Sequence, residues 1–269
     1  QARAFASFID RHLLWARSMP ALDGSHISDV WDRARWLIRP DHWIGVGQDV
    51  ARSLQRDGLT WGAGLLVVLA LMGARRWAKR RLAEIADRIR SVRYDRFSET
   101  LRALLWTVLM ALAWPALLGL IGWQLMASHH AGGFSHDLGF GLLMAAMLIA
   151  ILDGLRQILR PQGLAQAHFL WPEQTCRQLR RHLLWLLCGF PPLAAAITML
   201  VIHDDQGKQQ ELARVLFIVN MLAVTGFIVA ILRPRGGLIR MIVQRAPGGW
   251  LVRLRFLWIT IAVAASPAM

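Results

Sequence analysis

An apolar run that ends abruptly in a basic block places the strongest constraint on how this chain folds. Residues 59–74 are almost entirely apolar, and five Lys or Arg side chains follow within positions 75–81. Each of these cations would cost roughly 2.5–3.5 kcal/mol at the centre of a membrane helix. The sequence therefore predicts that the chain crosses a bilayer at residues 59–74. The basic block stays on one side, which the positive-inside rule identifies as the cytoplasm.

The composition extends this prediction to the rest of the chain. Of the 269 residues, 55% are apolar and 18% are charged, whereas soluble domains carry about 25% charged residues. We therefore predict an all-α fold, a polytopic transmembrane helical bundle with interfacial amphipathic helices. The apolar runs predict spans at about residues 59–74, 101–126, 138–159, 183–202, 212–232 and 256–269, the last one truncated by the end of the sequence.

Basic residues alternate from one predicted loop to the next. The net charge is +14, with ten Lys or Arg between residues 75 and 102 and none between 126 and 137. A single one lies between 203 and 211, and six lie between 233 and 255. This alternation is typical of membrane topology and of attraction to anionic lipid headgroups. A patch that binds nucleic acid would not alternate, so we predict membrane lipids as partners and no nucleic acid.

Tryptophan and basic side chains mark the expected membrane interfaces. Tryptophan prefers the headgroup level, and long cationic side chains extend from helix ends to the same level. The candidate lipid or interface residues are Trp61, Arg75, Arg76, Trp77, Arg80, Arg81, Trp171, Arg180, Arg181, Arg235, Trp250 and Arg253.

The first span is predicted to be short and to be followed by a second kind of helix. Its sixteen residues cover about 24 Å, less than a hydrocarbon core of about 30 Å. Local thinning of the bilayer or extension by flanking residues can absorb this mismatch. An apolar stripe at residues 78–92 lies between cationic positions. It predicts a separate amphipathic helix, either on the inner leaflet or solvated and packed on neighbouring loops.

Residues 1–58 differ from the spans in having balanced charge. Eight arginines and seven aspartates occur there, which suits the outer face, where no positive bias is required. We predict a short helical segment with helices at about residues 2–17, after Ser28, and from Pro40. Proline suits a first helical turn, and Asp41 lies at the positive end of the third helix dipole.

Several residues within the spans have predicted structural roles. Pro115, Pro191 and Pro192 should kink their helices, because proline removes a backbone donor. Gly139 and Gly141 allow close contact between helices.

Three polar residues lie within the predicted spans. Asp153 and Arg156 are three positions apart, so they can neutralise each other on one helix face. An ionisable pair in a span is a functional hypothesis by default, but the inner end of the helix lets Arg156 reach the interface, which favours a structural pair. Asn220 is expected to hydrogen-bond between helices, and contact with a transported solute is the alternative.

No pattern in the sequence supports enzymatic chemistry. His129, His130 and His136 lie in or beside a Gly-rich loop, which favours a solvated loop over a metal site, and the His203–Asp205 cluster is interpreted in the same way. Two cysteines alone make no metal site. We predict no catalytic, cofactor-binding or metal-binding residues and no enzyme activity.

Three segments resemble a known family. They are Leu13–Pro20 (LLWARSMP), Ala165–Glu173 (AQAHFLWPE) and Trp250–Trp258 (WLVRLRFLW). In these segments, and in the order and character of its sequence through most of its length, the chain resembles a family of bacterial mechanosensitive channels. This family is the MscK and MscM (KefA/YjeP-like) group of large, multi-helix channels in the MscS superfamily, and the likeness is to their inner-membrane part.

The resemblance implies a function and an assembly. The chain would supply peripheral, tension-sensing transmembrane helices of a bacterial mechanosensitive ion channel that opens under membrane tension in hypo-osmotic shock. It would form a homo-heptamer in the cell inner membrane, with residues 1–58 as the end of a larger periplasmic region. The ions would permeate a pore outside this fragment, so no pore-lining residue is carried over, and we expect the chain to be a piece of a longer protein.

Two other functions remain as alternatives. A secondary transporter would predict broken helices with paired acidic or polar groups at the bilayer midplane. A non-conducting membrane scaffold would bind a partner through its outer portion.

Overall fold

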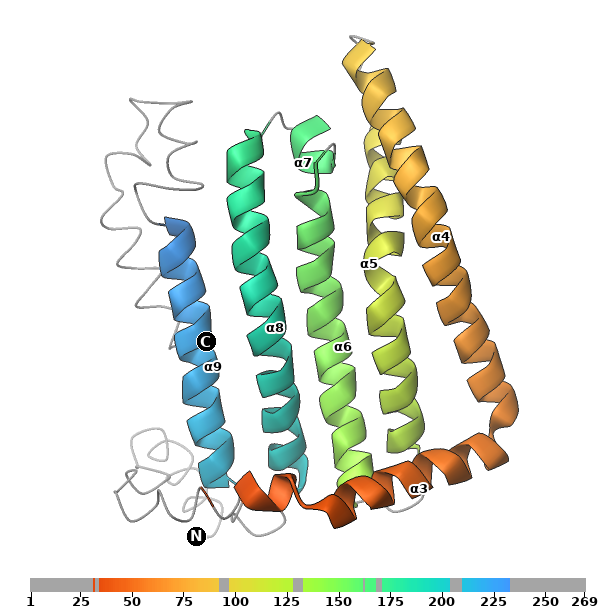
Figure 1. Cartoon of the computed structure of the whole chain (residues 1–269), viewed down its shortest axis with the longest axis vertical. Coiled ribbons are helices and arrows are strands. Elements are labelled where there is room, and N and C mark those ends of the chain that lie inside the picture. Colours follow the sequence, from red (N-terminus) through yellow and green to blue (C-terminus); the bar gives the residue numbers. More distant parts are fainter. Residues whose placement is uncertain are drawn as a thin grey trace, which may run out of the picture. The chain divides into compact units, whose positions relative to one another are not determined.

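The computed structural model describes residues 31, 34–91, 97–127, 133–161, 163–167, 171–203 and 210–232. Throughout these residues the regular structure is helical, which confirms the predicted all-α fold. The helices are α3 (Pro40–Arg56), α4 (Gly58–Ser91), α5 (Phe97–Met126), α6 (Phe134–Ile158), α7 (Leu164–Ala167), α8 (Glu173–His203) and α9 (Gln210–Leu232) (Figure 1).

Residues 1–38 form a separate unit. Among its described residues, the Arg35 guanidinium lies over the Trp31 ring, 5.5 Å from its centroid. The helix predicted at residues 2–17 and the Ser28 cap lie outside the described residues.

The long helices pack side by side in a row. In the second unit, α4 packs on α5, α5 on α6, α6 on α8, and α8 on α9 (Figure 1). All five are long and apolar enough to cross a membrane, at Gly58–Ala78, Leu104–Met126, Phe134–Ile158, Glu173–His203 and Glu211–Ile231. Five predicted spans therefore correspond to five helices of the described chain, and the sixth, at 256–269, lies outside it.

The first span extends beyond its apolar run. The candidate span within α4 has 21 residues, Gly58–Ala78, which cover about 32 Å, so flanking residues that include Arg75 and Arg76 lengthen the sixteen-residue apolar run. The helix also continues without a break to Ser91, so the helix expected at residues 78–92 is present up to Ser91 as part of α4, and its expected separation from the span is wrong. No Gly or Pro occurs between Ala74 and Ser91, and nothing in this stretch therefore stops an established helix.

Two other helix starts follow from local sequence. The helix α8 begins at Glu173, directly after Pro172, and carries the arginines of its first turns into the apolar run. In contrast, α6 begins at Phe134, four residues before the predicted start of its span. The polar residues that precede the apolar run are therefore helical rather than part of the loop.

Close contacts between helix backbones occur at glycines. A Cβ atom on Gly139 of α6 would lie 2.7 Å from the carbonyl oxygen of Gly122 on α5. On the same helix, a Cβ on Gly141 would lie 2.6 Å from the carbonyl oxygen of Ala195 on α8. The structure confirms the predicted close helix contact at Gly139 and Gly141, which lets α6 pack tightly against both neighbours.

The helix α3 lies across one end of the row. It begins at Pro40 with Asp41 in its first turn, as predicted, and contacts α4, α5 and α6 (Figure 1). Its large apolar side chains Trp43, Ile44 and Leu54 are exposed. We call this end of the row the α3 end.

The short helix α7 closes the other end, which we call the α7 end. Leu164 packs in one apolar cluster with Ala78 of α4 and Met110 of α5. The next residue, Ala165, packs in a second cluster with Leu159 and with Cys176 of α8. A four-residue helix therefore packs against the sides of α4 and α5 and fills the space between the end of α6 and the start of α8.

The three prolines predicted to kink helices all lie inside them. Pro115 is within α5, and Pro191 and Pro192 are within α8, and both helices continue through these positions. The kinks themselves remain a prediction.

Candidate functional site

The helix row exposes a large apolar surface. The side chains of Leu66 on α4, Trp185 on α8 and Leu222 on α9 are 66–71% exposed. In α4 and α9, the helices at the edges of the row, only 6% of the most apolar stretch is buried inside the protein. In α6, at the centre of the row, 33% of that stretch is buried. Exposed apolar area of this extent needs lipid or further apolar helices around it.

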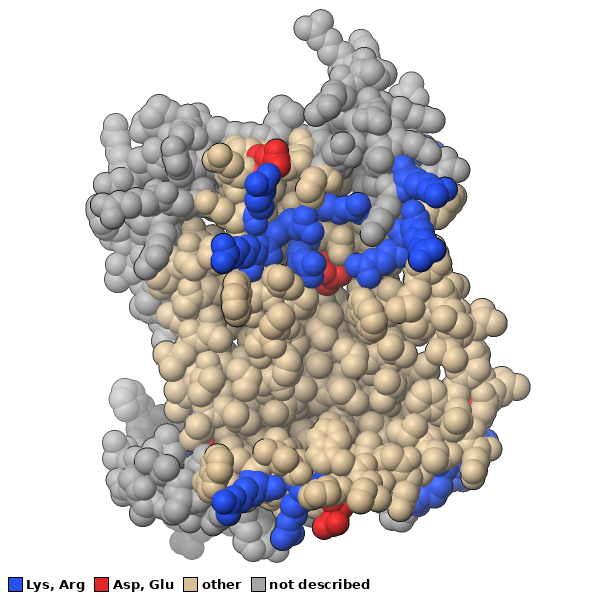
Figure 2. Space-filling model, in the orientation of Figure 1, with Lys and Arg blue, Asp and Glu red and all other residues tan. Residues whose placement is uncertain are grey.

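Charged side chains gather at the two ends of this apolar surface. Figure 2 shows a broad belt almost free of Lys, Arg, Asp and Glu, with basic side chains concentrated along one edge. This edge is the α7 end. Its basic residues come from α4, from α6 and the turn after it, and from α8; they are Arg75, Arg76, Arg80, Arg156, Arg160, Arg177, Arg180 and Arg181.

At the α3 end, polar side chains connect α3 to three spans. The Ser53 hydroxyl of α3 donates to Gln124 of α5 at 3.2 Å and accepts from the Trp61 indole N–H of α4 at 3.0 Å. Ser135 of α6 donates to the Asp49 carboxylate of α3. We call these five residues the α3 clasp. These hydrogen bonds help to fix the orientation of α3 on the row.

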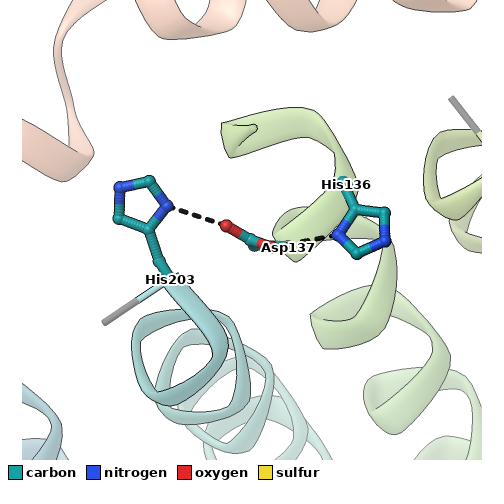
Figure 3. Close-up of polar contacts among 3 residues, drawn as sticks. All are labelled: His136, Asp137 and His203. Atoms are coloured by element: carbon teal, nitrogen blue, oxygen red, sulfur yellow. Dashed lines mark hydrogen bonds and ion pairs between the residues drawn. The ribbon is translucent and has the colours of Figure 1, made fainter. Parts of the chain in front are cut away.

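A buried carboxylate joins α6 to α8 beside this clasp. Asp137 is fully buried in the first turn of α6. His203, the last residue of α8, places Nδ1 2.7 Å from Oδ2 of Asp137, and His136 places Nδ1 3.1 Å from Oδ1 (Figure 3). A carboxylate only accepts hydrogen bonds, so both imidazoles donate through Nδ1. The two oxygens thus hold a ring from each helix.

The α7 end contains a second carboxylate cluster. Asp153 is buried in α6 and accepts hydrogen bonds from Gln157 at 3.1 Å and from Arg156 at 3.4 Å. The predicted pairing of Asp153 with Arg156 is therefore seen, with Gln157 as an additional partner. All three residues belong to α6, so the cluster stabilises one helix rather than joining two.

A cavity of about 260 Å³ opens beside this cluster, between α6, α7 and α8. Four of its lining side chains are the arginines Arg156, Arg177, Arg180 and Arg181, and Gln166 adds an amide. Arg156 and Arg160 repel the guanidinium of Arg180, whereas Asp153 attracts it. The cavity is therefore strongly cationic.

The predicted interface residues divide between the two ends. Trp61 lies at the α3 end, and the remaining described ones lie at the α7 end. Trp77 packs edge-on against Trp106, with 4.6 Å between ring centroids, and Trp171 packs against the apolar cluster beneath α7. The structure brings only Arg180 and Arg181 of this set together with Arg156, whereas Arg235, Trp250 and Arg253 lie outside the described residues.

The intramembrane amide has no visible partner for its oxygen. Asn220 is buried in α9, and its Oδ1 accepts no hydrogen bond from the described part of the chain. The interhelical hydrogen bond predicted for Asn220 is therefore not seen at this atom.

Sequence reasoning missed the polar contacts at the α3 end. The solvated loop expected around His136 is wrong there, because the loop ends before Phe134 and Asp137 is buried. His129, His130, Asp204 and Asp205 lie outside the described residues. The available signals were Gln124 inside a predicted span and Asp137 directly before the next one, since polar groups at such positions need partners.

Comparison with known proteins gives a consistent result. Residues 59–269 match the family model described as mechanosensitive ion channel inner membrane domain 1. Over 210 residues, the chain is 26% identical to the miniconductance mechanosensitive channel MscM of Escherichia coli (strain K12). This alignment covers 77% of the chain and 19% of that protein, so the chain spans about a fifth of the relative's length. No solved structure matches the chain.

Proposed function

This chain belongs to the family of mechanosensitive ion channels, in their inner membrane domain, and on that premise we propose that it supplies peripheral, tension-sensing helices. The whole channel opens under membrane tension in hypo-osmotic shock. The observation that carries the proposal is the row of five spans, in which the most apolar stretches of α4 and α9 are only 6% buried. Such a row presents apolar surface to lipid on both of its faces.

The physical basis of tension sensing is a difference between two states. Tension shifts an equilibrium only as far as the closed and open states differ in their interaction with the membrane. Helices that lie in a row can tilt or slide against lipid without rebuilding a central core. Kinks at Pro115, Pro191 and Pro192 would provide points at which α5 and α8 bend.

We assign the α3 end to the periplasm and the α7 end to the cytoplasm of the bacterial inner membrane. The arginines gathered at the α7 end support this orientation, because positive charge is retained on the cytoplasmic side. Residues 1–58 then form a helical periplasmic segment. Trp61, Arg76, Arg80 and the other predicted interface residues contact lipid headgroups at the two surfaces.

Assembly and permeation are properties of the longer protein. We propose a homo-oligomer, a heptamer by resemblance, whose ions pass through a pore formed outside the described spans. The nearly unburied edges α4 and α9 leave room for contacts with further helices. Within each subunit, Asp153 and Arg156 act as a structural pair, and Asn220 offers its free Oδ1 to a helix outside the described residues.

Patch recording tests this function. The full-length protein is expressed in giant spheroplasts that lack other mechanosensitive channels, and suction is applied in steps. We expect a current that appears above a pressure threshold. The absence of such a current, in patches shown to contain folded protein, would contradict the proposal.

Cysteine labelling tests the orientation. Exposed positions at the α7 end, Arg80 and Arg177, and at the α3 end, Arg56, are replaced singly by cysteine in a cysteine-free background. We expect a membrane-impermeant reagent added outside the inner membrane to label the Arg56 position only. Labelling of the Arg80 and Arg177 positions from opposite sides would refute the topology.

A further inference from the structure

The cavity at the α7 end holds more positive charge than the surrounding protein neutralises. Of its four arginines, Arg156 pairs with Asp153 and Arg177 pairs with Glu173. Arg180 and Arg181 form no hydrogen bond or ion pair with the described residues, and the Nε atom of Arg180 is buried without a partner. A buried donor without a partner costs free energy, and like charges near each other increase that cost.

We propose that this cavity binds the phosphate oxyanion of an anionic phospholipid headgroup. Guanidinium groups match phosphate in geometry as well as in charge, because two parallel N–H groups bind two oxygens. Arg180 and Arg181 supply such groups from one helix, and Arg156 faces them from another. The volume of about 260 Å³ accommodates a phosphate with part of its glycerol, but not a whole lipid.

The surroundings of the cavity indicate a lipid rather than a free ion. Leu184 lines the cavity and is 43% exposed, and the next residue, Trp185, is 71% exposed. Both belong to the apolar part of α8, just beyond the arginines. A headgroup held by Arg180 and Arg181 would therefore place its acyl chains on exposed apolar surface, which a free phosphate could not use.

This inference rests on the proposed function for the membrane orientation of the α7 end, because the headgroup must come from the leaflet on that side. Binding is measured without tension, so the two proposals can fail separately. Loss of pressure-activated current with retained lipid binding would contradict the proposed function alone. A current without selective lipid binding would contradict this inference alone.

Native mass spectrometry of the full-length protein provides the test. Protein stripped of lipid is titrated with phosphatidylglycerol, with phosphatidylethanolamine, and with inorganic phosphate. We expect phosphatidylglycerol to bind tightly at one site per subunit, and the other two to bind at least about 10-fold more weakly. Phosphatidylethanolamine has the same phosphate oxyanion, but its ammonium group is repelled by the arginines, and inorganic phosphate lacks the apolar contacts of the acyl chains. Equal binding of all three would overturn the proposal.

Matched variants locate the site. The double variant Arg180→Gln/Arg181→Gln is expected to weaken binding of phosphatidylglycerol about 10-fold or more. Arg76→Gln/Arg80→Gln removes the same charge at the same end, from exposed positions outside the cavity that meet headgroups at the general membrane surface. This variant should therefore lose weak attraction to anionic lipid but retain the one tightly bound phosphatidylglycerol per subunit. An equal loss in both variants would show general attraction to anionic lipid and would refute the site.

A conservative variant keeps the test decisive if the glutamine variant does not fold. Arg180→Lys/Arg181→Lys preserves the charge but removes the paired N–H geometry. We expect it to bind phosphatidylglycerol several-fold more weakly than the native protein does. Undiminished binding by a folded lysine variant would overturn the guanidinium site.

Discussion

The two ends of the helix row are stabilised in different ways. At the α3 end, polar contacts join different helices: Asp137 of α6 binds His203 of α8, and Ser53 of α3 binds the amide oxygen of Gln124 of α5. At the α7 end, the Asp153 cluster lies within one helix, and Arg180 and Arg181 face an open cavity. The α3 end is therefore held by the protein itself, whereas the α7 end depends more on what surrounds it.

Glycine packing shows the same difference along a single helix. Gly141, in the half of α6 toward the α3 end, lies against the backbone of Ala195, whereas a Cβ on Gly154, toward the α7 end, would meet nothing within 4 Å. The tightly packed half of α6 resists rearrangement, because a close-packed interior cannot shift by small steps without losing contacts or creating clashes. We therefore expect tension to move the spans mainly at the α7 end, with the α3 end as the fixed side.

The largest loss of stability is expected from removing the buried carboxylate at the α3 end. Asp137→Ala removes a fully buried carboxylate that accepts a hydrogen bond from each of the two imidazoles, which should lower the free energy of unfolding by about 3 kcal/mol. Thermal unfolding of the detergent-solubilised protein measures this loss. The control is Glu173→Ala, which breaks an exposed pair at the α7 end. Equal effects of the two variants would break the comparison between the ends.

A smaller effect is expected from the glycines of α6. Gly141→Ala places a methyl group 2.6 Å from the Ala195 carbonyl oxygen, so α6 and α8 must separate at a cost of about 2 kcal/mol. Gly154→Ala is the matched control on the same helix. It should be neutral or stabilise by up to about 1 kcal/mol, because alanine favours a helix. A loss as large at position 154 would show that the α7 half is packed as tightly as the other.

The α3 clasp should contribute less than either of these contacts. Ser53→Ala removes one acceptor and one donor, and leaves the Trp61 indole N–H without its partner. We expect a loss of about 1 kcal/mol and faster amide hydrogen exchange confined to α3. Gln55→Ala, at an exposed position of the same helix, serves as the control. If Ser53→Ala left exchange in α3 unchanged, the clasp would not hold that helix.

Much of this architecture is predictable because it depends on local sequence. The apolar runs predict the five described spans, and Pro40 and Pro172 mark helix starts, since their effects act within one turn. The Asp137 and Ser53 contacts are not predictable in the same way. They join residues 66 and 71 positions apart, and their partners become neighbours only when the order of helices in the row is known. The continuation of α4 to Ser91 was missed because a change in composition was interpreted as a change in structure.

The smallest loss of stability is expected from a substitution at the α7 end. This substitution should change lipid binding while leaving stability almost unchanged. Glu173 and Arg177 form an exposed pair, with side chains 65% and 77% exposed, so Glu173→Gln should lower stability by no more than about 1 kcal/mol. The same change frees Arg177 to face the cavity and removes a carboxylate from its lining, so binding of phosphatidylglycerol should become tighter. Thermal unfolding and lipid titration of one preparation measure both. Weaker lipid binding with unchanged stability would mean that Glu173 positions Arg177 for the headgroup, and that the α7 end is as internally organised as the α3 end.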